Sequence, residues 1–126
     1  MFKPKACLFD LDGLLLNTEP LHGEAWSKTA GKLGKKLTNN QLNQLKGRRR
    51  VECAKQIDRW LEDSVGEETV LKIHKPIIES IIGQSQAMPG AEELVRWCKN
   101  NALPMALVSS SATESVLLKT ANHPWL

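Results

Sequence analysis

Two aspartates near the N-terminus are the residues of this chain best suited to carry chemistry. Asp10 and Asp12 follow the apolar run of residues 6–9 and are separated by a single leucine. In a strand, positions two apart point to the same face, so both carboxylates can meet one reactant. Ligand sites of parallel sheets gather beyond the carboxyl ends of the strands. The pair therefore predicts a metal or acid–base site, although Asp-x-Asp-Gly also suits a plain turn and metal-binding Asp-x-Asp pairs occur in glycosyltransferases.

The apolar segments that would position these aspartates indicate two buried parallel strands. Residues 6–9 form the first strand, and residues 103–108 form the second, which runs directly into three serines, Ser109–Ser111. Short continuous apolar runs of this kind are typical of strands that are covered on both faces. A turn at residues 88–90 and a helix through residues 94–98 precede the second strand.

A long helical stretch interrupts these strands. Apolar residues recur there at helical spacing, and we predict helices at about 20–34, 38–47, 51–61 and 67–85. Pro76 should kink or split the last of them, because proline lacks the N–H that a helix interior uses. We therefore predict an α/β core formed by residues 1–15 and 87–126, with a helical cap domain inserted at 16–86.

Two pairs of side chains predict where helices begin. Thr38 with Gln41, and Ser111 with Glu114, have the spacing of a capping box. In that arrangement each side chain bonds a backbone N–H that the first helical turn leaves unsatisfied.

Composition limits the class of protein. The chain has 126 residues and a mass of 14.0 kDa, with 41% hydrophobic and 25% charged residues, which is typical of an ordinary globular domain. A net charge of +3 does not favour a nucleic-acid partner. Apolar runs fall far short of the roughly 20 residues that span a bilayer, so no membrane partner is predicted.

The cysteines indicate a reducing compartment. Cys7, Cys53 and Cys98 are odd in number and widely separated, so they predict buried free thiols rather than a disulfide framework or a zinc site. The first residues lack the apolar core of a signal peptide. We therefore predict a cytoplasmic protein.

Several segments together resemble one enzyme family. Residues Phe9–His22 closely resemble motif I of the haloacid dehalogenase superfamily, and their second part, Asn17–His22, resembles the β-phosphoglucomutase-like branch of phosphatases and phosphomutases. Residues 45–50 resemble the substrate loop of that branch's cap domain, and residues 107–109 resemble motif II. This resemblance implies an α/β fold with a Rossmann-like core and an inserted α-helical cap.

The resemblance also implies a mechanism. Asp10 would be the nucleophile that forms an aspartyl-phosphate, and Asp12 would be the general acid and then the general base. Mg²⁺ would bind to a side-chain oxygen of Asp10 and to the backbone carbonyl of Asp12. Ser109 and Ser110 would bind the phosphate, although serines at this position also suit helix capping.

The cap residues implied by the resemblance come from two parts of the predicted helical stretch. Arg50, Lys46 and Gly47 belong to the substrate loop, and His22 lies near the start of the cap. Arg48–Arg50 also fits a solvated basic loop. The substrate would be a small phosphorylated metabolite, such as a phosphosugar.

The chain departs from the family pattern after motif II. Family members continue to a motif with a lysine and to another with magnesium-binding acids, and neither occurs within 126 residues. Lys119 follows motif II too closely, and we interpret it as an ordinary helix residue. We expect the C-terminal portion of the same protein, or another copy, to complete the core. Three hypotheses stay open: a phosphatase, a β-phosphoglucomutase-type mutase, and a catalytically incompetent fragment or binding module.

Overall fold

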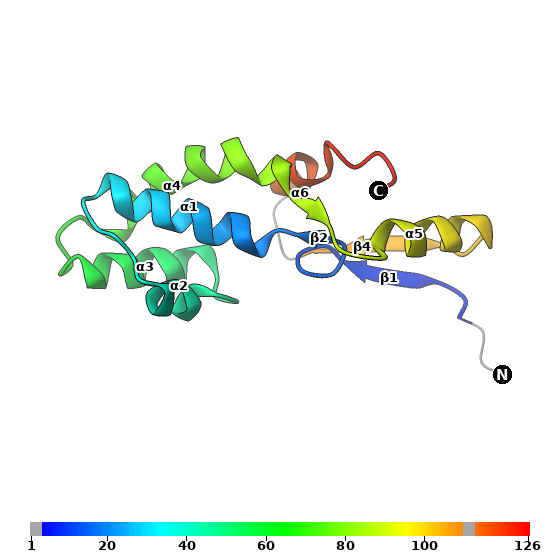
Figure 1. The fold of residues 1–126 in the computed structure, drawn as a ribbon, viewed down its shortest axis with the longest axis horizontal. Helices are drawn as coiled ribbons and strands as arrows, with labels where there is room; N and C mark the ends of the chain where they lie inside the picture. The colour runs from blue at the N-terminus through cyan, green and yellow to red at the C-terminus, as the bar shows by residue number, and fades with distance from the viewer. Residues whose placement is uncertain (1–3, 110–112) are drawn as a thin grey trace. The chain divides into compact units, whose positions relative to one another are not determined.

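The computed structural model describes residues 4–109 and 113–126 (Figure 1). The chain divides into two compact units. Unit 1 contains the residues up to Thr18 together with Ile82–Leu126, and unit 2 is Glu19–Ile81. None of the helices in the described ranges is long and apolar enough to cross a membrane.

Unit 1 is built on a parallel strand pair. Strand β1 (Cys7–Asp10) runs parallel to β4 (Met105–Val108), with Asp10 opposite Val108. This is the orientation that the two apolar runs predict. Helix α5 (Ala91–Asn100) packs its buried side chains against the side of β1 that carries Phe9. The resulting core contains Phe9, Leu11, Leu15, Leu16, Ala91, Val95 and Cys98.

The prediction that both strands are buried on both faces is wrong for the described chain. Alternate side chains of a strand point to opposite faces. Phe9 packs in the α5 core with 8% exposure, whereas its neighbour Leu8 is 72% exposed. All residues of β4 are exposed, including Val108. The face of β1 that carries Leu8 and the whole of β4 are therefore open to solvent in the described chain.

Unit 1 also contains a small antiparallel strand pair. Strand β2 (Leu16–Asn17) pairs with β3 (Gln86–Ala87), and a 3-10 turn, η1 (Ile82–Gln84), precedes β3. The last helix of this unit is α6 (Thr113–Thr120). The predicted cap limits of 16 and 86 are slightly wider than unit 2, because the β2–β3 pairing places both strands in unit 1.

Unit 2 consists of four helices (Figure 1). They are α1 (Glu19–Lys32), α2 (Asn39–Leu45), α3 (Arg50–Trp60) and α4 (Glu67–Ile81). Helix α4 packs against both α1 and α3. The main core of the unit contains Trp26, Ala30, Leu37, Leu45, Cys53, Ala54, Ile57 and Val70.

The structure tests two local sequence predictions in unit 2, the capping box at Thr38 and the effect of Pro76. The capping box of Thr38 and Gln41 is confirmed, with both reciprocal hydrogen bonds present at the start of α2. Pro76 does not split α4, because the helix runs unbroken through it. The buried α4 side chains, which include Val70 and Ile77, stabilise the helix enough to offset one missing hydrogen bond. The capping box predicted at Ser111 lies outside the described residues.

The cysteines are free thiols, as predicted. Cys53 and Cys98 are buried, and Cys7 is partly buried. Burial raises the pKa of the Cys53 thiol to about 11, so this side chain is a poor nucleophile at neutral pH.

Candidate active site

The loop after β1 presents two carboxylates close together. Asp10 ends the strand and is exposed, and its Oδ1 accepts a hydrogen bond from the backbone N–H of Leu11 at 2.9 Å. Leu11 is fully buried and anchors the loop, since its carbonyl accepts bonds from the N–H groups of Leu15 and Leu16. Gly13 has a φ of +79°, which a glycine adopts without strain. The tight turn explains why both aspartates lie at the carboxyl end of β1.

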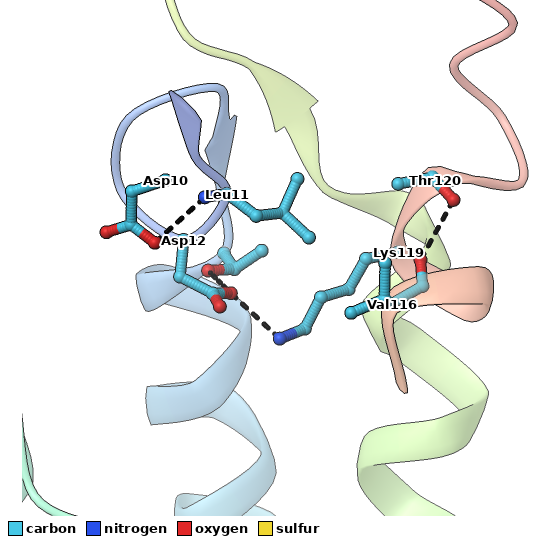
Figure 2. Close-up of polar contacts among 7 residues, drawn as sticks. Asp10, Leu11, Asp12, Val116, Lys119 and Thr120 are labelled. Carbon is cyan, nitrogen blue, oxygen red and sulfur yellow. Dashed lines mark hydrogen bonds and ion pairs between the residues drawn. The ribbon is translucent and has the colours of Figure 1, made fainter. Parts of the chain in front are cut away.

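Asp12 is held by two buried donors (Figure 2). Its Oδ1 accepts a hydrogen bond from the Thr18 hydroxyl at 2.8 Å and pairs with the Lys119 ammonium, also at 2.8 Å. Thr18 is 1% exposed and Lys119 is 2% exposed, whereas the Asp12 side chain is 33% exposed. One carboxylate oxygen is therefore fixed from the protein side, and because the group is planar this also fixes the direction of the other oxygen.

Lys119 belongs to the candidate site, so its interpretation as an ordinary helix residue is wrong. Figure 2 shows its side chain extending from α6 toward the carboxylate of Asp12. Lys119 lies three residues after Val116, which packs against the unit 1 core, so both share the inner face of the helix. A lysine on the inner face of an apolar helix is the sequence signal for a buried ion pair. Its partner could not be found from spacing, since the two residues are far apart in the chain.

Ser109 follows β4 directly and is partly buried. Because β1 and β4 are parallel and Val108 is opposite Asp10, Ser109 lies at the carboxyl end of the sheet, as the two aspartates do. The structure thus brings Asp10, Asp12 and Ser109 to the carboxyl end of the β1–β4 pair. Ser110, the second predicted phosphate ligand, lies outside the described residues.

Arg50 lies in unit 2 and makes two contacts with α4. Its Nε–H donates to Nδ1 of His74 at 3.2 Å, and its Nη2 donates to the carbonyl of Leu71 at 3.3 Å. Arg50 itself is exposed at the start of α3. The predicted substrate-binding arginine is thus accessible to solvent, and its position is fixed by two hydrogen bonds.

His74 is buried against Trp26. The two rings are stacked, with centroids 3.7 Å apart and planes 9° from parallel, and His74 is 2% exposed. Burial, with smaller contributions from the charges of Arg50 and His22, lowers the pKa of His74 from 6.5 to about 3. His74 is therefore a neutral imidazole at physiological pH.

The other predicted cap residues occupy two places in unit 2. His22 is partly buried on α1, and its charge acts on His74, so it belongs to the neighbourhood of Arg50. Lys46 and Gly47 are exposed in the connection between α2 and α3. Gly47 has a φ of +75°, which favours glycine at this turn.

Comparison with known proteins assigns the family. Residues 4–124 match the family model described as haloacid dehalogenase-like hydrolase. The chain belongs to this family.

Two similar proteins and one similar solved structure support this assignment. A Drosophila melanogaster protein described as a probable pseudouridine-5'-phosphatase is 33% identical over 93% of this chain and 51% of its own length. An Arabidopsis thaliana (DL)-glycerol-3-phosphatase, described as mitochondrial, is 27% identical over 92% of this chain and 40% of its length. The structure of β-phosphoglucomutase from Clostridium difficile matches with a TM-score of 0.70 at 27% identity, covering 94% of this chain and 56% of that one. The chain thus spans about half the length of the relatives it matches.

The haloacid dehalogenase-like family generally uses a divalent metal, and the donors in unit 1 suit one. The described residues contain no cluster of three or more His, Cys, Asp or Glu side chains that could hold an ion. The carboxylate of Asp10 and the carbonyl of Asp12 are both oxygen donors, however. A hard cation such as Mg²⁺ commonly binds one or two carboxylates and completes its shell with water and substrate phosphate. The donor chemistry therefore fits such an ion.

Proposed function

We propose that the protein hydrolyses small phosphate monoesters, such as phosphosugars, through a phosphorylated Asp10 and with Mg²⁺. The observation that carries this proposal is the exposed Asp10 at the carboxyl end of β1, with Asp12 two residues later and fixed by Lys119 and Thr18. Family membership and the phosphatase names of the relatives support it.

In the first step, an oxygen of the Asp10 carboxylate attacks the phosphorus of the ester. A bond forms between that oxygen and phosphorus, and the bond from phosphorus to the ester oxygen breaks. Asp12, in its protonated form, transfers a proton to the departing oxygen. Bound Mg²⁺ would reduce the repulsion between the carboxylate and the phosphate and stabilise charge on the transferring group. Asp10 and the carbonyl of Asp12 would hold it.

In the second step, Asp12 removes a proton from water, and the water oxygen attacks the same phosphorus. The bond between phosphorus and Asp10 breaks, which releases inorganic phosphate and restores the free carboxylate. Ser109 and Ser110 would donate hydrogen bonds to the phosphate oxygens in both steps. The Lys119 and Thr18 contacts fix one Asp12 oxygen, so the other can face the reacting group.

Unit 2 would supply specificity for the organic part of the substrate. Arg50 carries exposed donors that suit an anionic or hydroxylated group. His22, Lys46 and Gly47 complete the proposed set of substrate-binding residues. In this scheme, the residues of unit 1 bind the phosphate, and those of unit 2 distinguish one metabolite from another.

A phosphomutase is the second candidate function. It is favoured by the likeness to the Clostridium difficile β-phosphoglucomutase structure. A mutase uses the same Asp10 and Asp12, but a sugar hydroxyl rather than water accepts the phosphoryl group. Product analysis with a phosphosugar distinguishes the two, since a hydrolase releases inorganic phosphate and a mutase releases an isomeric sugar phosphate.

The test is a metabolite screen on the protein at its natural length, with Mg²⁺ and with the metal removed by chelation. We expect phosphate release that depends on Mg²⁺. Asp10→Asn should remove turnover and leave the fold intact, because it deletes the nucleophile and keeps its size. Asp12→Asn should slow turnover by about 10²–10⁴-fold, the range for loss of a general acid–base group. Substantial activity in the Asp10 variant would refute the proposal.

A further inference from the structure

We propose that His74 is a positioning residue that orients the guanidinium of Arg50 for the organic part of the substrate. This inference rests on the proposed function, because it gives Arg50 a substrate to bind. His74 itself is buried and touches no substrate in this scheme. It would act through the hydrogen bond between its Nδ1 and Nε of Arg50.

The first argument is the geometry of Arg50. An exposed arginine side chain has many rotamers, and fixing it costs conformational entropy. Here two acceptors on α4, Nδ1 of His74 and the carbonyl of Leu71, take hydrogen bonds from Nε and Nη2. Because two acceptors on one helix bind two nitrogens of a planar group, they fix both its place and its plane.

The second argument is which donors these contacts use. A guanidinium has five N–H donors, and Nε with Nη2 forms one edge of the group. That edge faces α4. The other edge, formed by Nη1 and Nη2, has the spacing that pairs with two neighbouring oxygens. The contacts thus direct Arg50 toward a carboxylate, a second phosphate or neighbouring hydroxyls on the substrate.

The third argument is that His74 is itself rigid and neutral. It is stacked on Trp26 with ring centroids 3.7 Å apart and is 2% exposed. An imidazolium would carry a proton on Nδ1 and could not accept from Arg50, so the contact requires the neutral ring. Burial and the nearby charges keep the pKa of His74 at about 3, which supports this form. The proton then resides on Nε2, which is buried and has no hydrogen-bond partner among the described residues.

Two substitutions separate positioning from packing. His74→Phe keeps a flat ring against Trp26 but removes the acceptor. His74→Asn loses the ring but can place its amide oxygen near the position of Nδ1. If His74 only packs, His74→Asn should weaken substrate binding more than His74→Phe. If His74 positions Arg50, His74→Phe should weaken substrate binding more than His74→Asn.

The kinetic measurement uses the protein at its natural length with its best metabolite and with p-nitrophenyl phosphate, which offers Arg50 no second group. We expect His74→Phe to raise KM for the metabolite about tenfold with a much smaller change in kcat, and to affect p-nitrophenyl phosphate much less. His74→Asn should recover most of the loss. Lys75→Gln, which removes a charge from the next residue of α4, is the matched control and should leave both KM values near those of the parent.

Arg50→Ala separates this inference from the proposed function. If the unsubstituted protein has no phosphotransfer activity, the proposed function fails. If Arg50→Ala raises KM for the metabolite but His74→Phe does not, the function stands and the positioning role is refuted. Adding His74→Phe to Arg50→Ala should raise KM no further, and a full additional effect would also refute the role.

A direct readout needs no activity. In nitrogen-15 NMR spectra of the same protein, the Nε–H of Arg50 should exchange slowly with water because it is hydrogen-bonded to a buried ring. Arg50→Ala assigns the signal. We expect it to be lost in His74→Phe and kept in His74→Asn. A signal unchanged in His74→Phe would show that His74 does not hold Arg50.

Discussion

Acidification should destabilise the fold of unit 2 through His74. The ring is neutral in the folded protein, where its pKa is lowered to about 3, and has its ordinary value of 6.5 when unfolded. The unfolded chain therefore binds the proton first as pH falls. The stabilisation is complete above about pH 6.5 and is lost progressively between about 6.5 and 3.

The size of this effect follows from the shift. Below the unfolded value, each pH unit costs about 1.4 kcal/mol until the folded ring also protonates. Between pH 7 and pH 5 the loss is about 2 kcal/mol, which corresponds to a change of about 1–2 M in the urea midpoint for a small domain. This is a large share of the stability of an ordinary domain.

Urea unfolding of the protein at its natural length, followed by tryptophan fluorescence, measures this loss. Trp26 is a suitable reporter, because it stacks on His74. The experiment compares the parent with His74→Phe at pH 7, 6 and 5, so that the contributions of other acids cancel. We expect the parent to lose about 2 kcal/mol more than the variant between pH 7 and pH 5. Parallel pH curves would show that His74 is not a buried neutral ring.

Two further predictions concern unit 1. Lys119→Met should lower the free energy of unfolding by about 1–3 kcal/mol, because it leaves Asp12 without its buried counter-charge. In urea unfolding this loss should largely vanish when Asp12→Asn is already present. Fully additive effects of the two substitutions would contradict the ion pair. The 126-residue chain alone should associate or aggregate and be inactive with Mg²⁺ and a phosphosugar, since Leu8 and Val108 expose an apolar sheet face. Sedimentation and a phosphate assay check this, and an active monomer would contradict it.

Much of the fold could be predicted from local patterns. The two apolar runs gave the strands β1 and β4, and the spacing of Thr38 and Gln41 gave the start of α2. These signals depend on residues that are neighbours in the chain. Pro76 is expected to kink or split its helix, and it does not split α4, because tertiary packing of the helix outweighs the cost of one missing bond. The exposed face of β1 could not be foreseen, since an apolar run does not show what covers it.

In the candidate site, too, features set by neighbouring residues could be predicted and features set by distant partners could not. The placement of Asp10, Asp12 and Ser109 at the carboxyl ends of β1 and β4 could be predicted, because each ends a strand or follows one within two residues. Lys119 and His74 could not, because their importance comes from partners that are distant in the sequence: Asp12 for one, Arg50 and Trp26 for the other. The roles of Asp10 and Arg50, the Mg²⁺ requirement and the cytoplasmic location stay predictions.

The most direct test of the central claim is to trap the phosphorylated enzyme. The protein at its natural length is mixed with Mg²⁺ and its best phosphate ester, quenched in acid within the first turnover, and analysed by peptide mass spectrometry. We predict a phosphoryl group on the peptide that contains Asp10, and its absence in Asp10→Asn. Turnover of the ester without any phosphoryl group on Asp10, or with one on another residue, would contradict the account.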